Sequence, residues 1–196
     1  MNLIGIILAS MVAGTSVTLP VSLASPCAFT VAGTAELPEV IGPESLVART
    51  RVVLQPDSPI RIQHVDVSKV SLNIRATNAV HSGEVVVRVQ NVGDRVVNEA
   101  MVSVFYWSGR GGSGQMPSLA SPLAPGETRQ LQARGSGITS RLPDEPDSAF
   151  EIRIFVESVT FDDCLYKPSQ VFPIIKARSV VGESITLPIH AVPDWR

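Results

Sequence analysis

The stretch GEVVVRVQNVGDRVV, residues 83–97, has the pattern of a buried strand that ends in a turn. Val85, Val87 and Val89 alternate with polar side chains such as Arg88. Because successive side chains of a strand point to opposite faces, the three valines share one face. This stretch therefore predicts a core strand with one face buried and the other facing solvent.

Two groups of turn residues accompany this strand. Asn91 and Gly93 follow it directly, and we expect Gly93 to adopt a positive φ while Asn91 hydrogen-bonds backbone groups across the turn. Further on, Pro125 and Gly126 stand at the two central positions of a predicted type II turn, and Leu123 before them is expected in the core. All of these roles are structural.

Working outward, the same two-residue alternation recurs along the chain. The segment GRGGSG at 109–114 is predicted to be a loop, and Pro188 indicates that the last run forms an edge strand. No stretch shows sustained 3.6-residue periodicity with helix caps. The fold class is therefore predicted as all-β, an antiparallel sandwich of about seven to nine short strands. The alternating runs are 70–75, 102–107, 130–133, 151–157 and 184–190.

The central segment resembles a known family. A strand ending in Asn-x-Gly, then an alternating strand, then Leu-x-Pro-Gly-Glu before another strand is similar to the CARDB-type and fibronectin-III-like domains of bacterial extracellular proteins. The resemblance covers residues 68–160, about half of the chain, and implies an Ig-like sandwich of extracellular type. It says almost nothing about a ligand, because its motifs are turns and strands. The matching residues are Asn91, Gly93, Val102, Val104, Leu123, Pro125, Gly126 and Glu127.

The N-terminus predicts export. Residues 1–24 carry no charged side chain, include a short apolar run, and end with Ser22 and Ala24, the small residues expected before a signal-peptide cleavage site. The run is too short to cross a bilayer comfortably. We therefore divide the chain into a signal peptide (1–24), an extended lead-in (25–60) with one or two short strands, and an Ig-like domain (61–196). The localisation is predicted as periplasmic or secreted, with no transmembrane segment after cleavage.

The chain has two cysteines, Cys27 and Cys164. Because export would take both out of the reducing cytosol, we predict a disulfide between them. Lipid attachment at Cys27 is the weaker alternative, since Pro26 stands where a lipobox has a small residue.

Composition and motifs argue against several function classes. The net charge of −2 and the scattered basic residues disfavour nucleic acid as a partner. His64, His81 and His190 lie far apart and show no metal-ligand spacing, and no nucleophile elbow or phosphate-binding loop is present. No metal, cofactor or catalytic residue is predicted. Loop carboxylates leave calcium binding open as an alternative; they are Asp144, Glu145 and Asp147, with Asp162 and Asp163 of unclear role.

One segment indicates binding. FYWSGRGGSGQMP places Phe105 and Trp107 on one strand face beside a Gly-rich segment with Arg110 and Gln115. These four residues form the candidate binding site; the alternative is that the two aromatic side chains pack beneath the N-terminal segment or the C-terminal strand.

The predicted function is that of a non-enzymatic interaction, adhesion or structural module, with another protein or a cell-surface glycan as partner. One alternative is a hydrolytic or carbohydrate-active protein, which requires a histidine near a carboxylate or serine in a cleft. Another is an assembly or chaperone subunit that adds a partner strand to an exposed edge.

Overall fold

The computed structural model describes residues 27–32, 37–108, 111–140, 146, 150–169 and 178–179. The predicted signal peptide and the predicted last strand at 184–190 lie outside these residues. The described part contains one short helix and ten strands: β1 (Glu39–Ile41), α1 (Glu44–Val47), β2 (Thr50–Val52), β3 (Ile60–Ile74), β4 (Asn78–Asn91), β5 (Glu99–Ser108), β6 (Gly111–Gln115), β7 (Thr128–Ser140), β8 (Glu151–Thr160), β9 (Leu165–Tyr166) and β10 (Arg178–Ser179).

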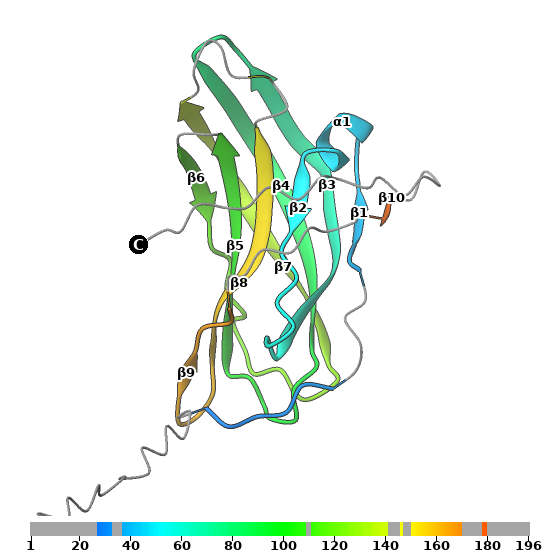
Figure 1. Ribbon diagram of the computed structural model, residues 1–196, viewed down its shortest axis with the longest axis vertical. Helices are drawn as coiled ribbons and strands as arrows, with labels where there is room; N and C mark the ends of the chain where they lie inside the picture. The colour runs from blue at the N-terminus through cyan, green and yellow to red at the C-terminus, as the bar shows by residue number, and fades with distance from the viewer. Residues whose placement is uncertain are drawn as a thin grey trace, which may run out of the picture.

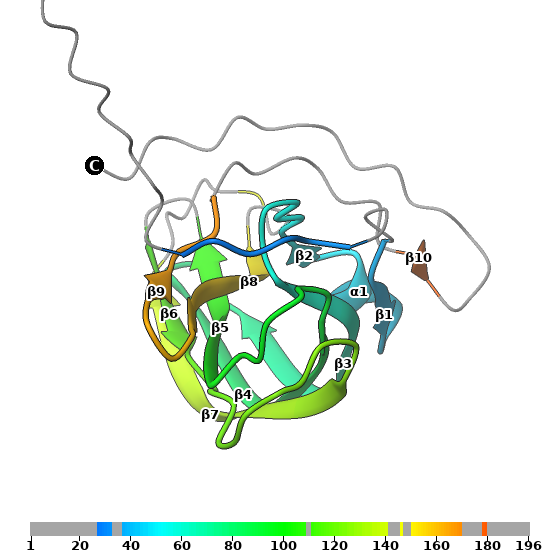
Figure 2. The same cartoon turned by 90° about the horizontal axis from the view of Figure 1, so that it is seen from below.

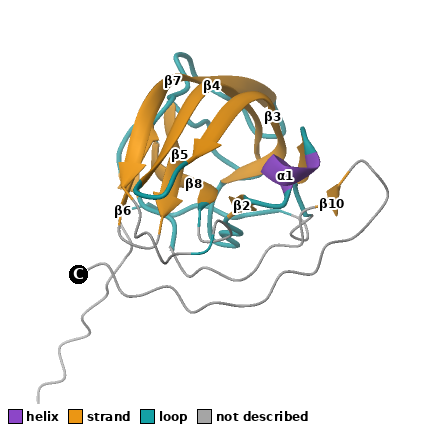
Figure 3. Ribbon diagram, turned by 90° about the horizontal axis from the view of Figure 1, so that it is seen from above, coloured by secondary structure: helices purple, strands orange, loops and turns teal. Residues whose placement is uncertain are grey.

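The strands form two sheets packed face to face, which confirms the predicted all-β sandwich (Figure 1). The first, called the β4 sheet, has the order β10–β1–β3–β4–β7, and the second, the β5 sheet, has the order β2–β8–β5–β6 with β9 also paired to β8. Viewed along the strands, β6 and β7 lie side by side where the two sheets meet (Figure 2). The helix α1 lies at the opposite side, between β1 and β2 along the chain (Figure 3).

The prediction of an antiparallel arrangement holds for the long ladders and needs correction at the short strands. The β3–β4, β4–β7 and β5–β8 pairs are antiparallel, whereas β1 is parallel to both β3 and β10, and β2 is parallel to β8. The helix α1 passes the chain from one sheet to the other, and the chain returns along β2 before β3 begins. Consequently β1 and β3 point the same way. Three-residue strands carry too little alternation to reveal this in the sequence.

The core lies between the two sheets and follows the predicted alternation. Val85, Val87 and Val89 of β4 are fully buried, as expected. The inward faces of β5 and β8 are also buried, including Tyr106, whose pKa burial raises to about 12. Each buried aliphatic side chain contributes about 1.5–3 kcal/mol relative to exposure, so these faces supply the main stabilisation.

Asn91 organises the turn at the end of β4. Its side-chain Oδ1 accepts a hydrogen bond from the Gly93 N–H at 2.9 Å, and its Nδ2 donates to the carbonyl oxygens of Arg95 at 2.8 Å and Leu123 at 2.9 Å. The predicted bonding across the turn is therefore confirmed. Since Asn91 is fully buried, its amide finds its hydrogen-bond partners in the backbone of the turn.

The two glycines of these turns serve different purposes. Gly126 has φ +79°, and the Glu127 N–H donates to the Ala124 carbonyl at 3.0 Å, as expected of a type II turn. The prediction for Gly93 is wrong, because its φ is not positive. A Cβ there would lie 3.0 Å from Pro59 Cβ, so glycine is favoured by close packing instead.

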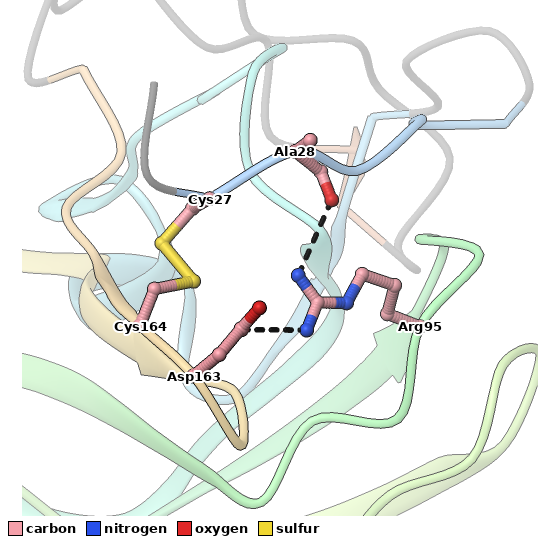
Figure 4. The surroundings of a disulfide bond; sticks show 5 residues. All are labelled: Cys27, Ala28, Arg95, Asp163 and Cys164. Carbon is pink, nitrogen blue, oxygen red and sulfur yellow. Dashed lines mark hydrogen bonds and ion pairs between the residues drawn. A yellow bond between two sulfur atoms is a disulfide. The ribbon is translucent and has the colours of Figure 1, made fainter. Parts of the chain in front are cut away.

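The predicted disulfide joins Cys27 to Cys164, whose Cα atoms are 5.6 Å apart (Figure 4). Arg95 lies beside it and donates to the Ala28 carbonyl at 3.3 Å and to Asp163 Oδ1 at 2.6 Å. That ion pair holds the pKa of the Asp163 carboxyl below its usual range. The bond and the arginine together attach residues 27–32 to the end of the sandwich.

A second polar cluster fixes the segment after β9 at the same end. Asp57 accepts hydrogen bonds from the Tyr166 hydroxyl at 2.7 Å and from the Ser169 N–H and hydroxyl at 2.7 and 2.8 Å. Burial alone would raise the pKa of Asp57, but these bonds outweigh it and lower the pKa. For Tyr166, burial and the bond to Asp57 raise the pKa to about 12.

Candidate binding face

The structure brings two of the four predicted binding residues together. Phe105 and Trp107 are half-buried on the outer face of β5, with ring centroids 6.0 Å apart. Gln115 pairs with Val104, an inward-facing residue, so its side chain lies on the other face of the sheet. Its amide lies against the backbone of Gly135 in β7. Arg110 lies outside the described residues.

The glycine-rich segment is a strand, so the prediction of a loop at 109–114 is wrong from Gly111 onward. Gly111–Gln115 forms β6, which pairs with the end of β5. A Cβ on Gly112 would lie 2.7 Å from Phe105 Cε1, and one on Gly114 would lie 2.7 Å from Phe105 Cδ2. The Phe105 ring therefore covers the backbone of β6, and the missing side chains leave room for it.

Charged residues of the neighbouring strands surround the two rings. The Arg153 guanidinium carbon lies 4.9 Å from the centre of the Trp107 ring, a cation–π contact. Glu151 accepts from Arg153 Nε at 2.9 Å and from Arg51 Nε at 3.3 Å. Burial lowers the pKa of Arg51, and Glu151 offsets this only in part. Arginine side chains carry their charge over the whole physiological pH range, so the face presents fixed charges beside its rings.

Phe155 extends the aromatic set along β8. The register pairs Ser103 with Phe155, Phe105 with Arg153, and Trp107 with Glu151. Directly opposite residues share a face, so these side chains lie on the outer side of the β5 sheet, where Ser103 is buried and Phe155 packs against the core. We call this surface the aromatic face; its residues are Arg51, Phe105, Trp107, Glu151, Arg153 and Phe155. The sequence prediction missed Phe155 and Arg153, although the alternation of 151–157 places them opposite the buried isoleucines.

Two of the three histidines of the chain have side-chain partners among the described residues. His81 Nε2 lies 2.9 Å from the Ser113 hydroxyl oxygen, and its ring stacks on Tyr106 with centroids 3.6 Å apart. His64 Nδ1 lies 2.9 Å from Glu39 Oε2. His190 lies outside the described residues.

The His81–Ser113 pair resembles a nucleophile and its base, but its surroundings differ from those of a catalytic pair. His81 is only 2% exposed, and its Nδ1 has no hydrogen-bond partner among the described residues. No carboxylate therefore orients the ring, as a triad requires. Burial lowers the pKa of His81, which keeps the imidazole neutral. The arrangement fits a bond that ties β6 to β4.

The carboxylates considered for metal binding divide into two groups. Asp144, Glu145 and Asp147 lie outside the described residues. Asp162 accepts a hydrogen bond from Asn98 at 2.6 Å, and Asp163 pairs with Arg95. Within the described ranges, no three His, Cys, Asp or Glu side chains converge on one point. No described helix has the length and apolar character to cross a bilayer.

Comparisons with known proteins found no match: no family model, no curated protein and no solved structure is significantly similar to this chain.

Proposed function

We propose that this protein is an exported, non-enzymatic interaction module that binds another protein through the aromatic face. The observation that carries the proposal is the grouping of Phe105, Trp107 and Phe155 with two arginines on the outer side of one sheet. The other layer of the sandwich packs against the opposite side of that sheet.

The chemistry of the face favours a protein partner. Trp and Arg dominate the residues whose truncation costs most at protein interfaces. Arg153 already covers part of the Trp107 ring, which reduces the open ring surface that a sugar would stack on. Because the side chains project from paired strands and Glu151 fixes both arginines, binding requires little additional ordering.

Export is supported by the disulfide, since such bonds persist in oxidising compartments. Export is tested by determining the N-terminal residue of the protein recovered from its source cells. A mature chain that begins near residue 25 is expected, and a retained residue 1 would contradict export.

The binding proposal is tested by placing a photoreactive phenylalanine analogue at position 107 of the full chain in the source cells. The matched control carries it at Gln132, which is exposed on the outer face of β7 in the other sheet. A discrete protein adduct from position 107 that position 132 does not give is expected. Equal adducts from both positions, or none from position 107, would contradict the proposal, and an adduct removed by glycosidases would indicate a glycan.

The non-enzymatic part of the proposal is tested at Ser113. Replacing Ser113 by Ala removes the hydroxyl next to His81 and is expected to leave the adduct at position 107 unchanged. By contrast, Trp107→Ala is expected to weaken binding of the captured partner at least about tenfold. A hydrolytic activity that Ser113→Ala abolishes would overturn this part of the proposal.

A further inference from the structure

The aromatic face carries a pair of arginines that share one carboxylate. Arg51 of β2 pairs with Arg153 of β8 across the parallel strands. Arg51 Nε lies 3.3 Å from Glu151 Oε1, and Arg153 Nε lies 2.9 Å from Glu151 Oε2. Thr50 and Val52 on either side of Arg51 are buried, so the Arg51 side chain lies on the outer side of the sheet. Glu151 therefore holds the two guanidinium groups close together on that face.

Both guanidinium groups keep hydrogen-bond donors that this cluster does not use. Nη1 of Arg51 donates to the carbonyl oxygens of Ala48 at 2.7 Å and Thr50 at 3.2 Å. Nη2 of Arg51 and both terminal nitrogens of Arg153 make no hydrogen bond to a residue in the described ranges. Because a guanidinium binds a carboxylate best through two parallel N–H bonds, the pair retains the donors that an anion requires.

A cluster of similar composition on the β4 sheet shows what distinguishes this pair. There, Glu84 lies 3.6 Å from Lys69 Nζ and 2.6 Å from Arg134 Nε. The side chains of these two cations are 67% and 68% exposed, whereas those of Arg51 and Arg153 are 24% and 16% exposed. Salt screens exposed charges strongly and partly buried charges much less. A carboxylate therefore gains more at the arginine pair of the aromatic face than at the cluster on the β4 sheet.

The charge of the arginine pair favours a single carboxylate as its ligand. Arg49 precedes β2 but has contacts of its own, among them a hydrogen bond to the Phe150 carbonyl at 3.4 Å. The two arginines of the pair and Glu151 leave one positive charge, which one carboxylate neutralises. A phosphate group, with a charge of about −1.5 to −2 at pH 7, would leave excess negative charge beside Glu151.

We propose that Arg51 and Arg153 bind the carboxylate of an acidic side chain that the protein partner presents to the aromatic face. The inference rests on the proposed function and adds the chemistry by which the partner is recognised. Arg153 lies over the Trp107 ring, so the bound carboxylate lies at the border of the aromatic surface. Apolar side chains next to the acidic residue then pack beside the rings of the face.

The partner captured from position 107 provides the first test. Arg51→Lys keeps the positive charge but loses the planar fork, and it is expected to lower the yield of the adduct at least about tenfold. Arg134→Lys, in the cluster on the β4 sheet, is the matched control and should leave the yield unchanged. An undiminished adduct in Arg51→Lys, or a captured peptide without Asp or Glu, would overturn this inference alone. No adduct in the parent chain would overturn the proposed function as well.

The fluorescence of Trp107 provides a second test, which needs no partner. Trp195→Phe leaves Trp107 as the sole tryptophan of the full chain. The probes are N-acetylglutamic acid α-amide and its uncharged glutamine analogue, compared at constant ionic strength. A saturable change with the acidic probe and none with the neutral probe is expected, and equal responses to the two would overturn the proposal. Inorganic phosphate should bind more weakly than the acidic probe, and tighter binding of phosphate would overturn the choice of a carboxylate.

Glu151→Gln separates anion binding from a purely structural role of the arginines. The variant removes the negative charge that competes with the probe, so the acidic probe should bind at least about threefold more tightly. A cluster that only stabilises the fold would be weakened by the same change. Unchanged or weaker binding of the acidic probe to Glu151→Gln would therefore contradict the proposal.

Discussion

At one end of the sandwich, the disulfide lies beside an arginine that joins three segments (Figure 4), and β4 ends there at a buried asparagine. At the other end, β5 and β6 meet (Figure 1), the glycines of β6 lie against half-buried aromatic rings, and a groove lies between α1 and the end of β3. We call these the disulfide end and the groove end.

Residues at the disulfide end stabilise the fold, whereas residues at the groove end can contact other molecules. At the disulfide end, polar side chains bond mainly to backbone groups of their own chain, which fixes segments distant in sequence. At the groove end, the rings of Phe105 and Trp107 and the side chains of Leu72 and Ile74 are only half-buried. Surfaces of that kind more often serve binding than stability, so variants at the two ends should differ in what they affect.

The largest effect is expected from removing the disulfide. The bond closes a sequence separation of 137 residues, and the chain-entropy model assigns roughly 4–5 kcal/mol to loops of that size. Replacing Cys27 and Cys164 together by Ser should lower the free energy of unfolding by about this amount, as measured by denaturant titration. An unchanged midpoint and slope would mean that the disulfide end does not depend on its covalent bond.

Asn91→Ala should cost about 3 kcal/mol, because it removes three hydrogen bonds of a buried amide, among them the one that the Gly93 N–H donates. The control is Asn73→Ala, whose side chain is exposed on β3 and should change stability by less than about 0.5 kcal/mol. The same titration measures both variants. Similar small losses in the two would show that the amide of Asn91 is dispensable.

The sequence predicted the disulfide end better than the groove end, for a physical reason. Asn91, Leu123 and Gly126 act within turns, where the residue type itself limits the backbone conformations and hydrogen bonds available. Gly93 is the exception, because the tight contact that favours glycine comes from Pro59, more than thirty residues earlier in the chain. Local chemistry does not reveal such contacts.

At the groove end, the decisive contacts join separate strands. The run GGSG has a loop composition, yet it forms a strand by pairing with the end of β5, and the Phe105 ring lies against Gly112 and Gly114. The aromatic face depends on the register between β5 and β8, so Arg153 could be placed beside Trp107 only once that pairing was known. The bond from His81 to Ser113 likewise requires that β6 lie against β7, where the two side chains meet over Gly137.

The role of the glycines in β6 gives the next prediction. A Cβ on Gly112 would lie 2.2 Å from the Tyr106 carbonyl oxygen, so Gly112→Ala must displace β6 or the Phe105 ring. We expect a loss of roughly 2 kcal/mol, the usual cost of overpacking. Gly111→Ala is the matched control, since its Cβ would have no neighbour within 4 Å. Equal melting temperatures of the two variants would contradict the packing of Phe105 on β6.

The smallest effect concerns the protonation of His81. Burial lowers the pKa of His81 below its ordinary value of 6.5, so the unfolded chain binds a proton more readily than the folded chain. The free energy of unfolding should therefore fall as the pH drops below about 6.5. The His81 contribution to this fall should end once the pH is below the pKa of His81 in the folded state.

Replacing His81 by Gln keeps a hydrogen-bonding side chain near Ser113 and removes this titration. The variant should show a weaker decline of the unfolding free energy between about pH 6.5 and 5 than the parent protein, measured by denaturant titration at a series of pH values. His64→Gln, on the outer face of β3, should retain the His81 contribution. If His81→Gln and the parent showed the same pH dependence, the imidazole would have to be reached by water, and the junction of β6 with β4 would be more open than its buried ring indicates.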